Sequence, residues 1–284
     1  MDIKRIKRNE VTSTNTYVKE LLAAGVDLPE LTLVEADFQT GGRGQTGNSW
    51  ESERGMNLTF SLVCHPTWLR AVDQFVLSQA IAVAVYRVLE ENLSLTSHRR
   101  SPQLLLFRNC PQGEGTGNQP DETPLLGRGR GRFFSIKWPN DIYWRDRKIC
   151  GTLIECNLAG ATIKDCIIGT GINVNQTEFR SDAPNPVSLA QIVGLTFSRE
   201  QILDRVVAEF ISIYKGLRDG GTEALRQEYM QHLYRREGFH TYQEPGGEPF
   251  EAEILDVEPA GHLVLRLRDG SVRRYEFKEI RYIL

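Results

Sequence analysis

Residues 134–175 read FSIKWPNDIYWRDRKICGTLIECNLAGATIKDCIIGTGINVN. Three apolar runs lie in this stretch, at residues 134–138, 148–156 and 162–169, and turn-forming residues separate them. Short apolar runs between such breaks are typical of β-strands. The stretch therefore predicts three strands close together in the chain.

A helix, two strands and a longer helix are expected upstream. Ser13-Thr14-Asn15 precedes a short amphipathic segment that Gly25 ends, which is the pattern of a capped helix. Residues 31–36 and 56–64 have the composition of buried strands. Residues 72–90 are apolar almost all round, so the helix predicted there should be deeply buried.

The chain changes character after two further helices, which are expected at residues 199–217 and 222–235. Alternating runs follow at 250–257, 262–267 and 272–277, and Asp269-Gly270 separates the last two. Asp-Gly between alternating runs is a hairpin signal. Residues from about 238 to 284 therefore predict a small separate β barrel, and the strands and helices before it predict an α+β fold.

Composition excludes several classes of protein. The 284 residues carry a formal net charge of −3, so there is no overall basic footprint for nucleic acid. No run approaches the roughly 18 apolar residues of a membrane span, and the charged N-terminus does not resemble a secretory signal. A cytosolic protein is expected.

The cysteines are odd in number and form no Cys-x-x-Cys pair, so we interpret them as small buried hydrophobic residues. They are Cys64, Cys110, Cys150, Cys156 and Cys166.

Residues 96–132 fit none of these elements. They are rich in glycine and contain the basic run Arg128-Gly129-Arg130-Gly131-Arg132. Structureless loops of this length are uncommon inside compact domains, so the segment is interpreted as an insertion. The basic run is compatible with nucleic-acid contact, but a solvated loop is the favoured interpretation.

Four polar or glycine-rich segments are candidates for chemistry. Gly42-Arg43-Gly44, with Gly47 and Trp50, offers backbone N–H groups and a guanidinium to an anion, but its spacing is neither a Walker loop nor a dinucleotide fingerprint. Lys137-Trp138-Pro139-Asn140-Asp141 offers a cation for phosphate and oxygens for polar groups or hydrated Mg²⁺, and it equally fits a simple β-turn. Lys148 and Gly151 begin a strand, and Gly169-Thr170-Gly171-Ile172-Asn173-Val174-Asn175 ends one. Each segment also has an interpretation without a functional role. Lys148 would then be an exposed lysine at the start of a strand, and residues 169–175 would be the end of a strand that leads into a turn.

Together and in this order, the segments resemble the motifs of the biotin protein ligase family: Ser-Thr-Asn, Gly-Arg-Gly…Trp, Lys-Trp-Pro-Asn-Asp, Lys-x-x-Gly-x-Leu-x-Glu and Gly-x-Gly-x-Asn-x-Asn. The resemblance covers almost the whole chain except the insertion. It implies a central mixed sheet with helices, like that of class II aminoacyl-tRNA synthetases, in a catalytic domain at residues 1–237, and an SH3-like domain at 238–284. Only a dozen residues precede Ser13, so the short form without an N-terminal DNA-binding domain is expected.

The family's chemistry has two steps, with ATP and biotin as substrates and Mg²⁺ as the accompanying metal. Biotin and ATP give biotinyl-5′-AMP, and a lysine of a biotin carboxyl carrier protein then attacks this mixed anhydride. Lys148 and Arg43 are implied as the catalytic cations. The resemblance assigns the biotin site to Ser13, Thr14, Asn15, Gln39, Gly42, Arg43, Gly44, Lys148 and Gly151. It assigns the nucleotide site to Trp50, Lys137, Asn140, Asn173 and Asn175, and no residue to a protein-held metal.

Two departures from the family pattern carry expectations. Gln45-Thr46 stands where many relatives have a second arginine, and fewer cations in the glycine-rich loop predict looser retention of biotinyl-AMP. That loop is expected to order over the reactive anhydride and exclude water. The insertion beside the Lys-Trp-Pro-Asn-Asp strand could modulate carrier docking or simply be tolerated.

Two other functions compete with this interpretation. A lipoate ligase or octanoyl transferase shares the architecture, and a transferase would use a thiol such as Cys150. A non-catalytic adaptor would use the small barrel and the Arg-Gly run to bind protein or RNA. Carrier identity and the choice between monomer and homodimer are left open by the sequence.

Overall fold

A seven-stranded mixed sheet forms the centre of the molecule in the computed structural model, which describes residues 3–44, 48–99, 132–181 and 183–283. The strand order is β1-β2-β3-β7-β6-β5-β4; β1 is parallel to β2, and the other neighbours are antiparallel. The mixed sheet predicted above is therefore confirmed. Its strands are β1 (Arg5–Arg8), β2 (Thr32–Ala36), β3 (Leu58–Cys64), β4 (Phe134–Lys137), β5 (Asp141–Trp144), β6 (Arg147–Ala159) and β7 (Thr162–Ile172).

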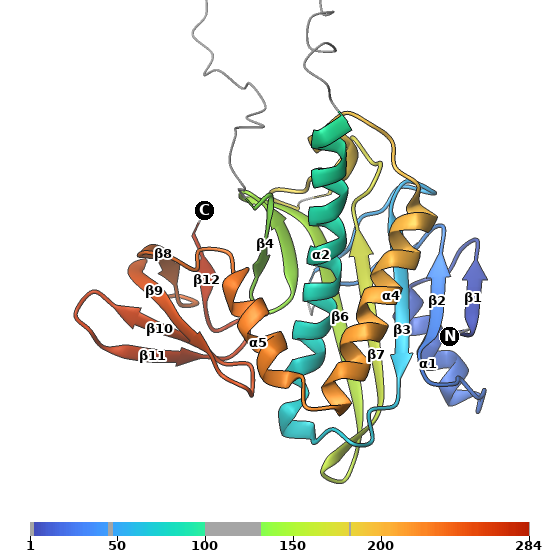
Figure 1. The fold of residues 1–284 in the computed structure, drawn as a ribbon, viewed down its shortest axis with the longest axis horizontal. Coiled ribbons are helices and arrows are strands. Elements are labelled where there is room, and N and C mark those ends of the chain that lie inside the picture. The colour runs from blue at the N-terminus through green and yellow to red at the C-terminus, as the bar shows by residue number, and fades with distance from the viewer. Residues whose placement is uncertain (1–2, 45–47, 100–131, 182, 284) are drawn as a thin grey trace, which may run out of the picture.

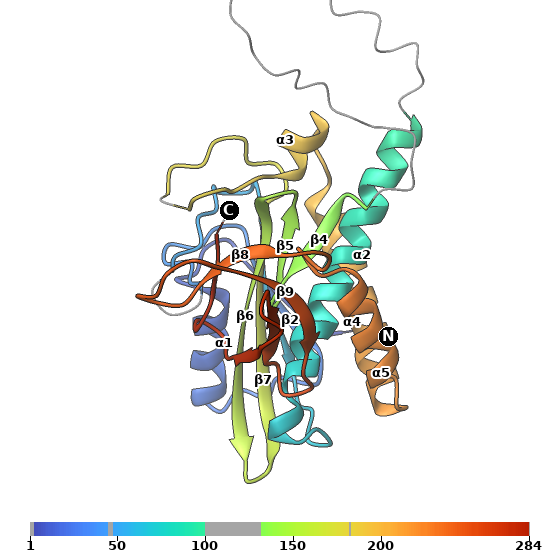
Figure 2. The same cartoon turned by 90° about the vertical axis from the view of Figure 1, so that its left-hand side faces the viewer.

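Helices cover both faces of this sheet (Figures 1 and 2). One face carries α1 (Thr14–Ala23), which contacts β2, β3 and β7. The opposite face carries α2 (Phe75–Arg99), on which α4 (Arg199–Arg218) and α5 (Thr222–Gln231) pack. Two short helices, η1 (Ala71–Asp73) and α3 (Leu189–Val193), lie in connections.

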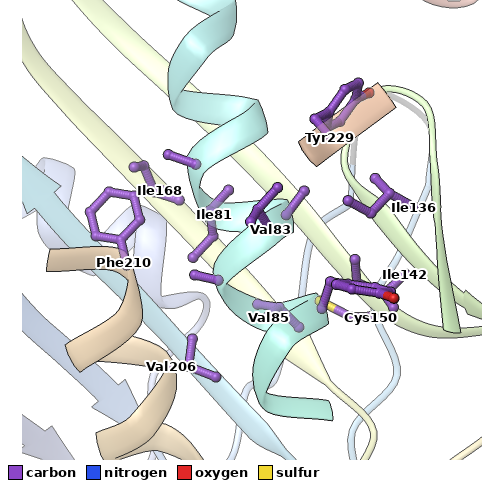
Figure 3. Close-up of a cluster of buried hydrophobic side chains, with 14 of the residues drawn as sticks. Ile81, Val83, Val85, Ile136, Ile142, Cys150, Ile168, Val206, Phe210 and Tyr229 are labelled. Carbon is purple, nitrogen blue, oxygen red and sulfur yellow. The ribbon is translucent and has the colours of Figure 1, made fainter. Parts of the chain in front are cut away.

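The main core lies between the sheet and α2 (Figure 3). Ile81 of α2, Phe210 of α4, and Ile136, Cys150 and Ile168 of the sheet have no exposed surface. In the described part of the chain, one stretch, Ala71–Ser94, is long and apolar enough to span a membrane, but 72% of its most apolar window is buried inside the protein. Its hydrophobicity is thus used by the core.

A second sheet lies beside the β4 edge of the first (Figure 1). It is antiparallel, with the order β11-β10-β9-β8-β12. Trp138 joins the two sheets, because its indole Nε1 donates to the carbonyl oxygen of Gly261 at 2.9 Å and its ring lies 5.8 Å from that of Phe277. The strands are β8 (His240–Gln243), β9 (Phe250–Val257), β10 (Leu263–Leu267), β11 (Val272–Tyr275) and β12 (Arg281–Tyr282).

Some element boundaries differ from the sequence expectations. The helix predicted at residues 222–235 ends at Gln231, because the backbones of His232 and Tyr234 hydrogen-bond to Ile136 of β4 instead. The helix predicted at 72–90 extends to Arg99. Most of the expected insertion, with Cys110 and the Arg-Gly run up to residue 131, lies outside the described residues, as does Gln45-Thr46-Gly47 of the glycine-rich loop.

Candidate active site

A pocket opens on the α1 face of the central sheet and gathers segments that are far apart in the chain. Its walls come from the start of α1, the glycine-rich loop, β5, β6, β7 and Phe277, which lies in the turn between β11 and β12. Most of the residues predicted for substrate binding meet here. Those in the lining are Ser13, Thr14, Asn15, Gln39, Arg43, Gly44, Trp50, Lys148 and Gly151.

Ser13 and Gln39 are placed by the N-terminus of α1. Ser13 occupies the N-cap position, but its side chain makes no capping hydrogen bond, and the residue lines the pocket. The backbone N–H of Thr14 donates instead to Oε1 of Gln39 at 2.8 Å. The N-terminus of α1 is thus bonded by the Gln39 amide, and the Ser13 hydroxyl lies beside it in this part of the wall.

A buried polar cluster holds Asn15 in place. Its Oδ1 accepts from Oγ of Ser61 at 2.7 Å, and its Nδ2 donates to Glu155 at 2.9 Å. Lys19 pairs with the same Glu155 carboxylate at 2.6 Å. Ser61 is also 2.8 Å from the hydroxyl of Thr14. Buried polar groups need hydrogen-bond partners, and these groups supply them to one another. The side chains at this end of the pocket are therefore held in place before any ligand binds.

Glycines of β7 make the close packing in the pocket possible. A Cβ on Gly169 would lie 2.1 Å from Oδ1 of Asn15, and a Cβ on Gly171 would lie 2.3 Å from the indole of Trp50. The Trp50 indole therefore rests directly on the strand, and its buried Nε1 has no hydrogen-bond partner among the described residues. Gly42 supports it from the loop, since its carbonyl oxygen accepts from the Trp50 N–H at 2.9 Å.

Lys148 and Asp141 form an ion pair inside the pocket. Nζ of Lys148 lies 2.6 Å from Oδ2 of Asp141, and both side chains are about one-quarter to one-third exposed. The backbone of Lys148 is fixed by hydrogen bonds with Asn185 and Val187, at 2.8 and 2.9 Å. An ammonium held at the start of β6, and not a freely exposed lysine, is what stabilisation of an anion requires.

Arg43 has a different partner in this structure. Its guanidinium donates to the hydroxyl of Thr16 on α1, at the rim of the pocket. The expected closure of Arg43 over a carboxylate and a phosphate therefore stays a prediction about the ligand-bound protein.

The four remaining residues assigned to nucleotide lie outside the lining. Nζ of Lys137 is 3.2 Å from the Tyr143 hydroxyl, and burial lowers the pKa of this lysine. Both ends of the Asn175 amide bond the backbone of Phe197 at 2.9 Å. Asn140 and Asn173 are each 3% exposed, and each has a buried Oδ1 without a partner in the described part of the chain.

Sequence reasoning did not predict the contacts of three residues that the structure places at the site. Asp141 and Glu155 belong to the quoted motifs, yet only the fold shows that they contact Lys148 and Asn15. Ser61 carried a weaker signal, namely its position in an alternating strand whose other face is apolar. Each of the three hydrogen-bonds or ion-pairs with a residue that the sequence predicted for the site.

The thiol required by the transferase interpretation is not accessible. Cys150 has no exposed surface and lies in the core on the opposite face of the sheet, and burial raises the pKa of its thiol. A buried neutral thiol is a poor nucleophile. The described part of the chain therefore does not support a thiol intermediate at Cys150.

The described residues do not form a protein cage for a metal. Within residues 3–44, 48–99, 132–181 and 183–283, no group of three His, Cys, Asp or Glu side chains is close enough to hold an ion. The pocket lining includes one carboxylate, Asp141, and Lys148 is bound to it. The donor set therefore does not fit a resident metal that is ligated by the protein alone.

Comparisons with a protein family model and with known sequences agree on the kind of protein that this chain is similar to. The model of the Biotin/lipoate A/B protein ligase family matches residues 8–173. "Bifunctional ligase/repressor BirA" of Bacillus subtilis is 27% identical over 278 residues, covering 95% of this chain and 71% of the relative. "Biotin--[acetyl-CoA-carboxylase] ligase" of Mycobacterium tuberculosis is 24% identical, covering 92% of this chain and 82% of the relative.

Solved structures share the fold. Biotin protein ligase from Aquifex aeolicus, in complex with biotin and ATP, superimposes with a TM-score of 0.70 at 21% identity and covers 99% of both chains. The Leishmania major enzyme in complex with biotinyl-5-AMP gives a TM-score of 0.59 at 22% identity. Since the family model matches more than half of the sequence and the fold agrees over its length, this chain belongs to the biotin/lipoate A/B protein ligase family.

Proposed function

We propose that this protein is a biotin–protein ligase. It condenses biotin with ATP to biotinyl-5′-AMP and pyrophosphate, and it then transfers the biotinyl group to a lysine of a biotin carboxyl carrier protein or domain. One observation carries the proposal: the Ser13-Thr14-Asn15 segment, the glycine-rich loop and Lys148 line a single pocket. The names of the relatives, which are biotin ligases, support the same substrate.

The preformed polar end of the pocket fits the ureido ring of biotin. A cyclic urea presents one carbonyl oxygen and two N–H groups, so it needs both donors and acceptors from the wall. Ser13, Thr14 and Gln39 supply them, while Asn15 is held by Ser61 and Glu155 and orients this wall. Fixed polar groups of this kind give specificity at little entropic cost.

In the first step, a biotin carboxylate oxygen bonds to the α-phosphorus of ATP, and the bond to the β-phosphate oxygen breaks. Negative charge grows on the phosphate oxygens. Lys148, at the end of the pocket away from Asn15, stabilises that charge when it exchanges Asp141 for the substrate oxygens. Arg43 joins it when the loop closes. The unpartnered Oδ1 atoms of Asn140 and Asn173 are buried outside the lining, so they accept from the adenine amino group only after neighbouring groups move on nucleotide binding.

In the second step, the amine of the carrier lysine bonds to the acyl carbon, and the bond to the AMP oxygen breaks. The incoming ammonium must lose a proton before or during attack. Once Lys148 binds the phosphate, the carboxylate of Asp141 is free to accept that proton. AMP leaves with its charge still neutralised by Lys148.

Mg²⁺ belongs to the proposal as part of the substrate. It enters with ATP on the polyphosphate and keeps most of its water, which is its usual mode of binding in nucleotide enzymes. This agrees with the single carboxylate in the described lining. A cytosolic location and the carrier protein as the macromolecular partner are proposed with it, since both ATP and carboxylases are found there.

The deciding experiment is acid-dependent pyrophosphate–ATP exchange, with biotin, lipoate and octanoate assayed in parallel. Exchange with biotin alone is expected. Exchange with lipoate alone would keep the fold and overturn the substrate, and no exchange with any acid would overturn adenylation itself. Transfer of labelled biotin to a carrier domain, with lysine-to-arginine replacement of its acceptor as the control, then tests the second step.

Replacing Lys148 tests its catalytic role. Lys148→Ala should weaken transition-state stabilisation by about 2–4 kcal/mol, roughly 30- to 900-fold in kcat/KM for adenylation. Lys164→Ala is the matched control, because Lys164 is exposed on β7 and is not in the pocket lining. If the two variants exchanged pyrophosphate equally fast, Lys148 would not be the catalytic cation.

A further inference from the structure

Three cysteines form a row across adjacent strands on the core face of the central sheet. Cys166 of β7 is the Cα partner of Cys156 on β6 and of Cys64 on β3, and all three are free thiols. Cys64 and Cys166 have no exposed surface, whereas Cys156 packs against the core with part of its surface exposed. The proposed ligase chemistry uses none of these thiols.

Cys156 and Cys166 meet the geometric requirements of a disulfide. Directly opposed residues on antiparallel strands have Cα atoms about 4.5–5.5 Å apart, within the range of about 4.4–6.8 Å found in disulfides. The two Sγ atoms are 3.0 Å apart, so the side chains point toward each other. Because both strands belong to one hairpin, the chain already holds this pair together, and forming a bond needs only a small movement of the side chains.

Cys64 is a less suitable partner for Cys166, although it is opposed to it on the other side. The Cys64 thiol donates to the carbonyl oxygen of Cys166 at 3.8 Å. Both residues are fully buried, so an oxidant would have to enter the core to reach either one. Cys156, in contrast, directly precedes the exposed residues 157–159 at the end of β6. Oxidation is therefore expected to begin at Cys156.

We propose that Cys156 and Cys166 are a redox-active pair, which a small disulfide such as oxidised glutathione converts reversibly into an intramolecular disulfide. In the first step, the Cys156 thiolate bonds to one sulfur of the oxidant, the S–S bond of the oxidant breaks, and one thiolate leaves. Cys166 then attacks Sγ of Cys156, and the second thiolate leaves. The protons of the two cysteines end on the two released thiols, so the protein loses two electrons and the oxidant gains them.

The rate of this exchange should depend strongly on pH. The hydrogen bond with Cys166 and burial raise the pKa of the Cys156 thiol. Since the thiolate is the nucleophile, the pair reacts slowly at neutral pH, and the rate should rise about tenfold per pH unit below that pKa. Cys150 is also buried, but it has no exposed surface through which an oxidant could reach it.

The experiment treats the full native chain with an excess of oxidised glutathione at mildly alkaline pH, blocks the remaining thiols and maps the peptides by mass spectrometry. Proteolytic cleavage after Glu155 and Lys164 separates Cys156 and Cys166 from each other and from Cys150. We expect one cross-link between the peptides that carry Cys156 and Cys166, lighter by about 2 Da than the two reduced peptides together, since two hydrogens are lost. Dithiothreitol should reverse it completely.

Serine variants test the order of the two steps. Cys166→Ser should keep a glutathionyl group on Cys156, because the second thiol is missing, whereas Cys156→Ser should leave Cys166 unmodified, because Cys166 has no exposed surface. Cys64→Ser is the matched control, since it removes the other thiol opposed to Cys166 and should keep the cross-link.

The wild-type peptide map decides the proposal even if a serine variant fails to fold. Free Cys156 and Cys166 after prolonged treatment would overturn it, as would a cross-link from Cys166 to Cys64. Glutathionylation of Cys166 in Cys156→Ser would show that the exposed thiol is not the point of entry and would overturn the proposed order of attack.

Discussion

The two faces of the central sheet are built from the same strands but have different roles, since one face forms the core and the other forms the pocket. On β7, Ile168 packs into the core beneath α2, while its neighbour Gly169 faces Asn15 and the pocket. The core face is filled with aliphatic side chains and has no exposed surface at Ile168. The pocket face replaces side-chain volume with glycine and polar groups. The alternation of a strand thus lets one segment stabilise the fold and shape the site independently.

The largest effect is expected from the core face. Ile168→Ala should lower the free energy of unfolding by about 2–5 kcal/mol, because it leaves a cavity in a fully buried cluster (Figure 3). Ile168→Val should cost only about 0.5–1.5 kcal/mol. Urea unfolding measures both. Below the transition, the Kd for biotin should be that of the wild type, and a large change in Kd would show that the faces are not independent.

A smaller effect, on function more than on stability, is expected one residue further along. Gly169→Ala would place a methyl group 2.1 Å from Oδ1 of Asn15 and displace that amide from Ser61 and Glu155. We expect overpacking to lower the free energy of unfolding by about 1–3 kcal/mol. The Kd for biotin should rise by about 5- to 150-fold, which is the same range of free energy. Titration calorimetry checks it.

Gly216→Ala is the control for that variant. Its Cβ would meet nothing within 4 Å, and Gly216 lies within α4. This change should stabilise the protein by about 0.5–1 kcal/mol through helix propensity and leave the Kd unchanged. If Gly169→Ala bound biotin as tightly as Gly216→Ala, the polar wall would not be the biotin site.

The core face was largely predictable from sequence, and the pocket face only in part. Continuous apolar runs around Ile81 and Ile168 predicted the buried helix and strand, because burial on that face follows directly from hydrophobicity. The edge strand β1 was missed, since Arg5–Arg8 is basic and only Ile6 indicates a buried face. β5 was missed because Asp141–Trp144 follows a turn-like Pro-Asn sequence.

The site residues were identified by their motifs, but their contacts were not. Pairing of Asp141 with Lys148 depends on the register of β5 and β6, which has an irregularity at Ile142/Tyr143. No local pattern encodes such a register shift. The same holds for Asn175, whose amide is bound to Phe197 far along the chain. Sequence reasoning therefore names candidates, and tertiary geometry separates groups that face ligand from groups that hold the scaffold.

The smallest effect sharpens that separation at the end of β7, where two asparagines have different surroundings. Asn173→Ala removes a buried Oδ1 without a partner in the described part of the chain, together with one hydrogen bond that Nδ2 donates to the carbonyl oxygen of Val187 at 3.2 Å. Stability should fall by about 0.5–1.5 kcal/mol, whereas the KM for ATP should rise roughly 5- to 30-fold, about 1–2 kcal/mol. Asn175→Ala removes two hydrogen bonds to Phe197 and should show the reverse, a loss of about 1–3 kcal/mol in stability with a smaller change in KM. Steady-state adenylation and urea unfolding of both variants measure the four quantities. A stability loss in Asn173→Ala as large as that in Asn175→Ala would mean that the Asn173 amide supports the scaffold, and the adenine site would then have to lie elsewhere along the pocket.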